Sequence, residues 1–231
     1  MSIAENLAAV RARIADAARA AGRDPSSVTL VAVSKTKPIE DLVAAHGAGQ
    51  RIFGENYAQE LRDKADVLGP SYDWHYIGSL QRNKVKYVVG RATLVHDVDS
   101  IALAEEIGKR SGTRTTGILL GVNIGEEPQK SGFLPGEVIA AARTVATLPG
   151  VELRGLMCIP PAEGAARPYF ARLAALAEEG RAQGLPLHEL SMGMSHDVEE
   201  AIAEGATYVR VGTAIFGARE RRAAGIAEPT G

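Results

Sequence analysis

A lysine follows directly on an apolar run near the start of the chain. In the stretch VTLVAVSKTKP, residues 28–38, apolar side chains lead to Ser34 and Lys35, and a helical pattern opens at Pro38. Because an ammonium group is costly to bury, such a lysine usually reaches water or pairs with a carboxylate, here Glu55. Partial burial also lowers the pKa of an amine and lets it form a Schiff base with an aldehyde. Lys35 alone leaves these alternatives open.

Two glycine-containing segments late in the chain have the composition of an anion site. LSMGMS contains Ser191, and VRVGTAIFG contains Gly212 and Thr213 just after a strand-like run. A hydroxyl, closely approaching glycine backbone and the amides of a helix start can hold a phosphate, and barrel phosphate sites follow strands seven and eight. The alternative is that these glycines only form tight turns. Ser195, ahead of Asp197, is expected to cap a helix.

An amine and a phosphate cradle at one end of a barrel would suit a flat ring that carries both an aldehyde and a phosphate. Pyridoxal 5'-phosphate has this chemistry. Arg210 supports this interpretation, because a guanidinium keeps its proton and could only donate to the pyridine nitrogen. The alternative for Arg210 is a surface or inter-strand ion pair. We therefore predict pyridoxal phosphate as the cofactor.

Eight β-type runs alternate with helical patterns and must position these residues. The strands are predicted at 30–34, 51–53, 74–77, 94–97, 117–123, 152–157, 188–191 and 208–211. A further helix is expected in the first 22 residues, where apolar residues recur at helical spacing. Eight β/α units favour a closed barrel over an open sheet with one miscounted strand. We predict an α/β protein with one domain over 1–231, a (β/α)8 TIM barrel with an extra N-terminal helix.

Composition argues against several classes of protein. Lys and Arg number 26 against 28 Asp and Glu, so the net charge of -2 gives no basic field for nucleic acid. The charged first helix and the lack of a long apolar run argue against a signal peptide and a membrane span. Cys158 is the only cysteine, which fits a reducing cytoplasm and predicts a small core thiol. The five histidines lack zinc-ligand spacing, so no metal site is predicted, and only His75 is kept as a neighbour of the site.

Six motifs together resemble those of a known family. LVAVSKTKP, FGENYAQE, WHYIGSLQRNK, KSGF, GLMCIPP and LSMGMSHDVEEAIAEGATYVRVGTAIFG are similar to the YggS/PROSC family, the pyridoxal phosphate homeostasis proteins, over nearly the whole chain. The resemblance implies a barrel like the N-terminal domain of alanine racemase, with the coenzyme linked to Lys35. The other cofactor-binding residues that it implies are Ser191, Gly212 and Thr213 at the phosphate, Arg210 at the ring nitrogen and Asn56 beside the ring.

An enzyme and a carrier remain to be separated. Racemases and decarboxylases on this barrel carry a second, β-rich domain, whereas here a short polar tail, ARERRAAGIAEPTG, follows the last strand. An arginine at the ring nitrogen makes a poorer electron sink than a carboxylate would, although the related racemases have that arginine too. We predict a protein of intracellular pyridoxal phosphate homeostasis that holds and delivers the coenzyme, with no catalytic residues. The alternatives are a small amino-acid racemase and a class I aldolase-like enzyme that uses Glu55 beside Lys35.

The expected partners follow from that prediction. They are pyridoxal phosphate itself and the apo-enzymes that receive it, with no nucleic acid and no membrane. The protein is expected to be a cytoplasmic monomer, with a dimer left open.

Overall fold

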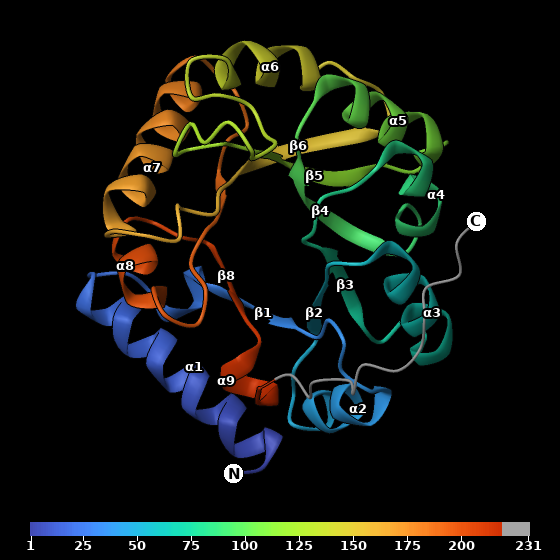
Figure 1. Ribbon diagram of the computed structural model, residues 1–231, viewed down its shortest axis with the longest axis vertical. Helices are drawn as coiled ribbons and strands as arrows, with labels where there is room; N and C mark the ends of the chain where they lie inside the picture. Colours follow the sequence, from blue (N-terminus) through green and yellow to red (C-terminus); the bar gives the residue numbers. More distant parts are fainter. Residues whose placement is uncertain (219–231) are drawn as a thin grey trace.

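Strand order around the barrel follows the order of the sequence. In the computed structural model, which describes residues 1–218, eight parallel strands pair with their neighbours in sequence, and β8 closes the barrel against β1 (Figure 1). The strands are β1 (Thr29–Val33), β2 (Ile52–Glu55), β3 (Asp73–Tyr76), β4 (Ala92–Val98), β5 (Thr116–Gly121), β6 (Val151–Met157), β7 (Glu189–Ser191) and β8 (Tyr208–Val211). The predicted barrel is confirmed, and every predicted strand boundary lies within two residues of the observed one.

Helices surround the barrel. They are α1 (Ile3–Ala20), α2 (Ile39–Gly47), α3 (Ala58–Leu68), α4 (Val85–Val88), α5 (Ile101–Ser111), α6 (Val138–Val145), α7 (Arg167–Ala182), α8 (Val198–Ala203) and α9 (Thr213–Phe216), with 3-10 turns at Pro25–Ser27 and Arg82–Lys84. The predicted N-terminal helix is confirmed as α1, which lies beside α8 and α9 in Figure 1. None of these helices within residues 1–218 has both the length and the apolar character needed to cross a membrane.

The first helix shows how the sequence sets its position. The Ser2 side chain accepts from the Glu5 amide, and the Glu5 carboxylate accepts from the Ser2 amide, so both groups satisfy helix-start donors. Leu7, Val10 and Ile14 recur on one face of the helix and are buried. The exposed face carries alanines and charged residues, so α1 packs against the barrel along one stripe.

The barrel strands are buried on both faces, as parallel strands covered by helices must be. Every residue of β5 is buried. Leu94, Leu119 and Met157 form a small cluster separate from the main core, and Tyr208 packs against it. The Tyr208 ring also contacts the buried rings of His75 and His96. Polar side chains therefore enter a part of the barrel that is otherwise aliphatic.

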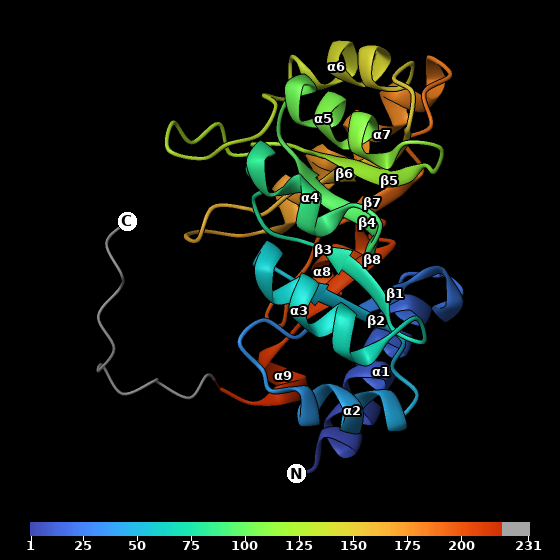
Figure 2. The same cartoon turned by 90° about the vertical axis from the view of Figure 1, so that its right-hand side faces the viewer.

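The loops after the strands gather on one side of the molecule. Figure 2 shows the loops that follow β5 and β6 extending to the same side as α9. This side is the carboxyl end of the barrel, where β/α barrels build their sites. Residues 219–231, which make up nearly all of the predicted polar tail, lie outside the described residues.

Candidate functional site

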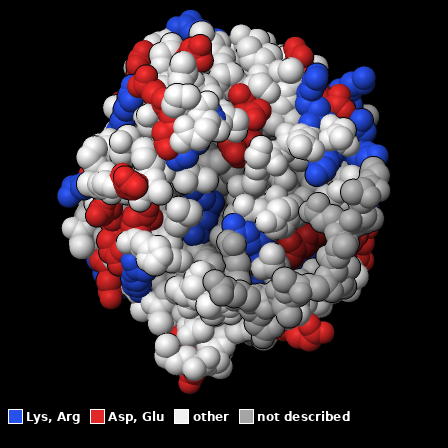
Figure 3. All heavy atoms as spheres, in the orientation of Figure 1, with Lys and Arg blue, Asp and Glu red and all other residues white. Residues whose placement is uncertain are grey.

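The residues predicted to bind the cofactor come from neighbouring strand ends. Lys35 follows β1, Asn56 follows β2 directly, and Arg210 lies within β8. Because β1 pairs with both β2 and β8, these three residues belong to adjoining strands. Figure 3 views this face and shows basic atoms gathered in the hollow at its centre. The site is therefore concentrated on one part of the barrel mouth.

The end of β1 and the start of α9 are packed closely together. A Cβ added to Gly212 would lie 3.1 Å from the Val33 carbonyl oxygen and 3.2 Å from its Cβ, so a larger residue would push the segments apart. The Lys37 Nζ donates to the carbonyls of Phe216, Gly217 and Ala218 just after α9. The loop that carries Lys35 is thereby tied to the segment that begins at Gly212.

The start of α9 exposes backbone donors toward the mouth. Thr213 is the first residue of α9 and is exposed, and Gly212 is half-buried. The amides in the first turn of a helix have no carbonyl of an earlier turn to bond, so they can accept an anion as partner. This segment therefore has the donors that a phosphate needs.

Arg210 is a buried cation with neutral partners. Its side chain is 4% exposed, and its guanidinium donates to the Ser191 hydroxyl and, over 3.1 Å, to the Cys158 carbonyl. It is buried and forms no salt bridge within residues 1–218, so these residues give no support to the alternative of a surface or inter-strand ion pair. Burial lowers the pKa of Arg210, yet a guanidinium stays charged. The charges of Asp97 and Asp197 also favour its charged form.

A chain of neutral groups lies behind Arg210. Ser191 is fully buried, and its Oγ lies 2.7 Å from His96 Nδ1; His96 Nε2 lies 2.9 Å from His75 Nδ1. Desolvation lowers the pKa of His75 to about 4 and that of His96 well below its usual value. Because a guanidinium can only donate, the Ser191 hydroxyl oxygen accepts a hydrogen bond from Arg210. The Ser191 O–H then donates to His96 Nδ1, and the His96 Nε2–H donates to His75 Nδ1.

This chain was only partly predicted. His75 was kept as a neighbour of the site, but His96 was not connected to it. The two imidazoles are 21 residues apart, and no spacing rule joins them. A histidine in each of two consecutive predicted strands was the one available signal.

Asn56 has an unused acceptor. Its side-chain Oδ1 is buried and has no hydrogen-bond partner among the described residues, while its backbone carbonyl accepts from the Tyr76 hydroxyl over 2.9 Å. A Cβ on Gly78 would approach that carbonyl to 2.4 Å, so glycine allows the close fit. A buried acceptor without a partner is costly unless a ligand or water satisfies it. The free Oδ1 therefore fits a ligand at this position.

The expected helix-capping role of Ser195 is wrong. The helix α8 begins at Val198, and the Asp197 carboxylate accepts from the Met194 amide instead. The Ser195 carbonyl accepts from Arg13. Because the Arg210 amide donates to the Gly193 carbonyl, the loop that contains Ser195 lies beside the end of β8.

Glu55 is bound to a different lysine from the one considered in the sequence. Its side chain is fully buried, and its Oε1 accepts from Lys64 Nζ and from the Ser34 hydroxyl, each over 2.7 Å. Its Oε2 has no hydrogen-bond partner among residues 1–218. Burial raises the pKa of Glu55 to about 7, despite the nearby Lys64.

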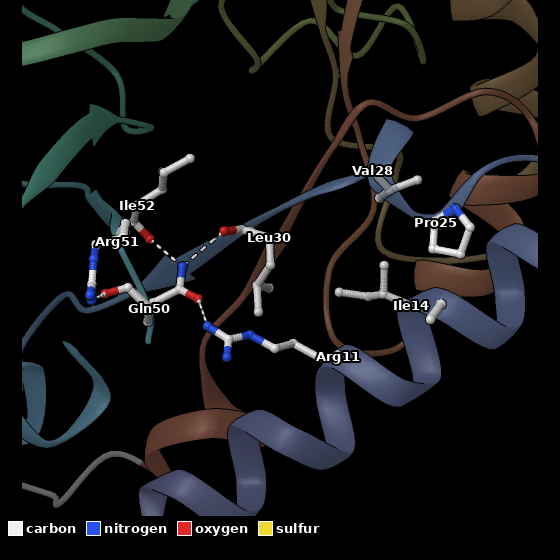
Figure 4. Close-up of a pocket in the computed structure, with 9 residues that line it drawn as sticks. Arg11, Ile14, Pro25, Val28, Leu30, Gln50, Arg51 and Ile52 are labelled. Carbon is white, nitrogen blue, oxygen red and sulfur yellow. Dashed lines mark hydrogen bonds between the residues drawn. The ribbon is translucent and has the colours of Figure 1, made fainter. Parts of the chain in front are cut away.

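A recess also lies at the opposite end of the barrel. It has a volume of about 310 Å³ and lies between α1 and the starts of β1 and β2 (Figure 4). Gln50 there donates to the carbonyls of Leu30 and Ile52 and accepts from Arg11, so its polar groups already bind one another. We assign the candidate site to the carboxyl ends of the strands, where Lys35, Arg210 and the start of α9 belong to adjoining strands and the segments that follow them.

Known proteins match the chain over almost its whole length. The family model described as alanine racemase, N-terminal domain, matches residues 6–220. A pyridoxal phosphate homeostasis protein of Pseudomonas aeruginosa is 46% identical over 222 residues, covering 95% of this chain and 96% of that protein. One of Escherichia coli is 44% identical over 227 residues, covering 94% and 97%. The structure of PipY of Synechococcus elongatus with pyridoxal phosphate bound has a TM-score of 0.82 and 40% identity, covering 94% of this chain and 100% of PipY.

The fold and the strand-end residues define a class of barrel typified by the N-terminal domain of alanine racemase. The matches place the chain more closely within that class. It belongs to the family of pyridoxal phosphate homeostasis proteins, as the motifs in the sequence indicated.

Proposed function

We propose that this protein binds pyridoxal phosphate at the mouth of the barrel and acts in its intracellular homeostasis by holding it and delivering it. The observation that carries this proposal is that Lys35, the buried Arg210 and the exposed start of α9 lie on adjoining strands or directly after them. The coenzyme would supply an aldehyde for a Schiff base with Lys35 and a phosphate for the helix start. The pyridoxal phosphate in the structure of PipY supports the same choice of ligand.

The other residues take roles that follow from their chemistry. Arg210 donates to the ring nitrogen, because its guanidinium has neutral partners on the protein side and keeps its proton. The amides of Gly212 and Thr213 receive the phosphate. Asn56, with its unsatisfied Oδ1, lies beside the ring.

The two serines of the SMGMS segment, Ser191 and Ser195, have different proposed roles. Ser191 is a predicted phosphate ligand, but its hydroxyl is buried between Arg210 and His96. We propose that Ser191 holds Arg210 in place. The Ser195 hydroxyl, which caps no helix, is the better candidate for the phosphate because its loop lies beside the end of β8.

A carrier fits the site better than a racemase. A two-base racemase needs a second acid or base near the substrate carbon, in addition to Lys35. His75 and His96 are buried and bonded within the chain behind Arg210. The relatives that match over the whole chain are named for homeostasis. We propose that the protein has no robust racemase activity and passes its coenzyme to apo-enzymes.

The covalent link is tested by reduction and peptide mapping. Purified protein loaded with pyridoxal phosphate is treated with borohydride, and the modified peptide is identified. We expect a pyridoxyl group on Lys35 and none in the Lys35→Ala variant. A label on Lys37 or Lys84 in the wild-type protein would refute the assignment.

The phosphate site is tested by blocking it. Gly212→Glu places a carboxylate at the proposed anion site, where it repels the phosphate and fills its space. We expect a large loss of affinity for pyridoxal phosphate and a much smaller loss for pyridoxal. Because any side chain at Gly212 presses on Val33, Gly212→Ala is the control, and equal losses for both ligands that do not exceed those of Gly212→Ala would place the phosphate elsewhere. Ser195→Ala and Ser191→Ala then compare the two hydroxyls, and only the former should distinguish the two ligands.

Delivery and catalysis are tested side by side. The loaded protein is mixed with an apo-transaminase, and regained transaminase activity is measured beside chiral analysis of alanine and serine after long incubation. We expect reactivation without racemisation. Robust racemisation that Lys35→Ala abolishes would favour the racemase alternative.

The remaining expectations are part of the same proposal. We propose a single domain over 1–231 and a cytoplasmic monomer. Limited proteolysis and light scattering of the full chain test the first and the last of these, and fractionation tests the location.

A further inference from the structure

The loop that carries Lys35 has a strained backbone. Thr36, the next residue, has φ of 63°, which side chains other than glycine rarely adopt. Ser34 and Lys37 close the turn, since the Lys37 amide donates to the Ser34 carbonyl over 3.0 Å. A conformation of this kind persists only when the surroundings hold it.

A buried ion cluster holds both sides of Lys35. On the side before Lys35, the Ser34 carbonyl accepts from Lys64 Nζ over 2.8 Å. On the side after it, the Thr36 amide donates to Glu60 Oε1 over 2.7 Å. Lys64 Nζ also donates to that Glu60 oxygen over 2.7 Å. The two peptide groups that flank the Lys35 Cα are therefore bound to the two ends of one ion pair.

The cluster is also held by Glu55 at the end of β2. Lys64 is 6% exposed, and its third acceptor is the fully buried Glu55, which accepts from the Ser34 hydroxyl as well. Lys64 and Glu60 are one turn apart on α3, and Glu55 ends β2. Two separate elements thus converge on the turn formed by residues 34–37.

We propose that Lys64 and Glu60 are positioning residues for Lys35. By binding the peptide groups on both sides of it, they hold the Lys35 Cα in the strained turn and so aim its amine at the aldehyde. Burying the ionisable groups of Lys64 and Glu55 is costly, and apolar side chains would fill the same space at lower cost. A contribution to stability therefore does not account for this cluster. A role in fixing the position of the Lys35 amine accounts for each of its contacts. The inference rests on the proposed function, since it assigns a support to the same amine.

The test separates Schiff-base formation from binding. Pyridoxal 5'-phosphate and pyridoxine 5'-phosphate share the ring and the phosphate, but the second has an alcohol in place of the aldehyde. The first reports both steps, through the absorption of the Schiff base and borohydride trapping on Lys35. The second reports only the non-covalent site, through calorimetry.

Glu60 offers a matched set of variants, because its side chain is 22% exposed and tolerates change. Glu60→Leu removes the acceptor of the Thr36 amide, whereas Glu60→Gln retains an oxygen at that position. We expect Glu60→Leu to slow Schiff-base formation by about tenfold or more, as loss of a charge-assisted hydrogen bond would. Its affinity for pyridoxine phosphate should change by less than about threefold, and Glu60→Gln should retain most of the rate. Gln59→Leu, at an exposed position of the same helix, is the control.

A rescue variant addresses the backbone directly. Glycine adopts positive φ without strain, so Thr36→Gly should restore part of the rate lost in Glu60→Leu. Lys64→Met should repeat the effect of Glu60→Leu, provided that urea unfolding shows a folded protein. Recovery in the double variant would support positioning, because a role confined to stability predicts none.

Two results would overturn the inference and are distinguishable from failure of the proposed function. Glu60→Leu with an unchanged rate of Schiff-base formation would do so, as would equal losses for both ligands. If the wild-type protein binds neither ligand, or carries no label on Lys35, the proposed function fails and the inference fails with it.

Discussion

Replacing Glu55 by glutamine should change how stability depends on pH. The pKa of this carboxyl rises from 4.5 to about 7 because it is fully buried. The native state therefore binds the proton more tightly than the unfolded state does. Stability from this group is complete below pH 4.5 and is lost as the pH rises through about 7. Glutamine has no proton to lose, so the variant lacks this dependence.

The size of the effect follows from the shift. The rise in pKa from 4.5 to about 7, at about 1.4 kcal/mol for each pKa unit, corresponds to about 3.5 kcal/mol. The free energy of unfolding of the wild type, relative to Glu55→Gln, should fall by that amount between pH 4.5 and about pH 8. Taking this difference cancels groups that titrate in both proteins, among them His75, whose pKa of about 4 has the opposite effect.

Urea unfolding at a series of pH values measures both proteins. Glu199→Gln is a useful contrast, because the Arg13 guanidinium lowers the pKa of Glu199. The wild type should have a higher free energy of unfolding than Glu199→Gln at neutral pH, and this difference should disappear on acidification, the reverse of the dependence expected for Glu55. Parallel curves for wild type and Glu55→Gln would refute the burial argument, since the carboxyl would then have the same pKa folded and unfolded.

Three further predictions concern stability and reactivity. Gly155→Ala should prevent folding or cost more than about 3 kcal/mol, because its Cβ would lie 1.7 Å from the Glu189 carbonyl oxygen; soluble yield and thermal unfolding measure this. Ser2→Ala should cost about 1 kcal/mol in urea unfolding, because it removes the N-terminal cap of α1. Cys158 is buried and its pKa is raised to about 12, so a thiol reagent should modify it only as fast as the protein unfolds; modification faster than unfolding would contradict its burial.

The fold could be predicted because its signals are local. Apolar runs such as that of β5 alternate with helical patterns, and each run is short enough to be assigned as a strand. Closure followed from counting eight units. The polar residues at strand ends then indicated where Lys35 and Gly212 would meet, since parallel strands end at one edge.

The supports of the site could not be predicted in the same way. Lys64 reaches the Ser34 carbonyl from 30 residues away, and His96 reaches Ser191 from 95. Such contacts depend on barrel register and side-chain direction, which a single sequence does not specify. The expectation for Ser195 fails because α8 begins at Val198 with Asp197 at the N-cap position, two residues after Ser195, and a run of polar residues does not fix that start.

The two supports differ in charge, and the difference bears on what the site can do. The turn at Lys35 rests on an ion cluster in which Glu60 and Lys64 bind the backbone and Glu55 binds Lys64 and the Ser34 hydroxyl. Arg210 rests on a hydroxyl and a carbonyl, with two imidazoles behind them whose low pKa values keep them neutral. A carboxylate in place of either neutral acceptor would neutralise the guanidinium and weaken its pull on a ligand. In the proposed function Arg210 donates to the ring nitrogen, and a guanidinium there would keep that nitrogen unprotonated; this is one argument for the proposed storage of the coenzyme over carbanion chemistry.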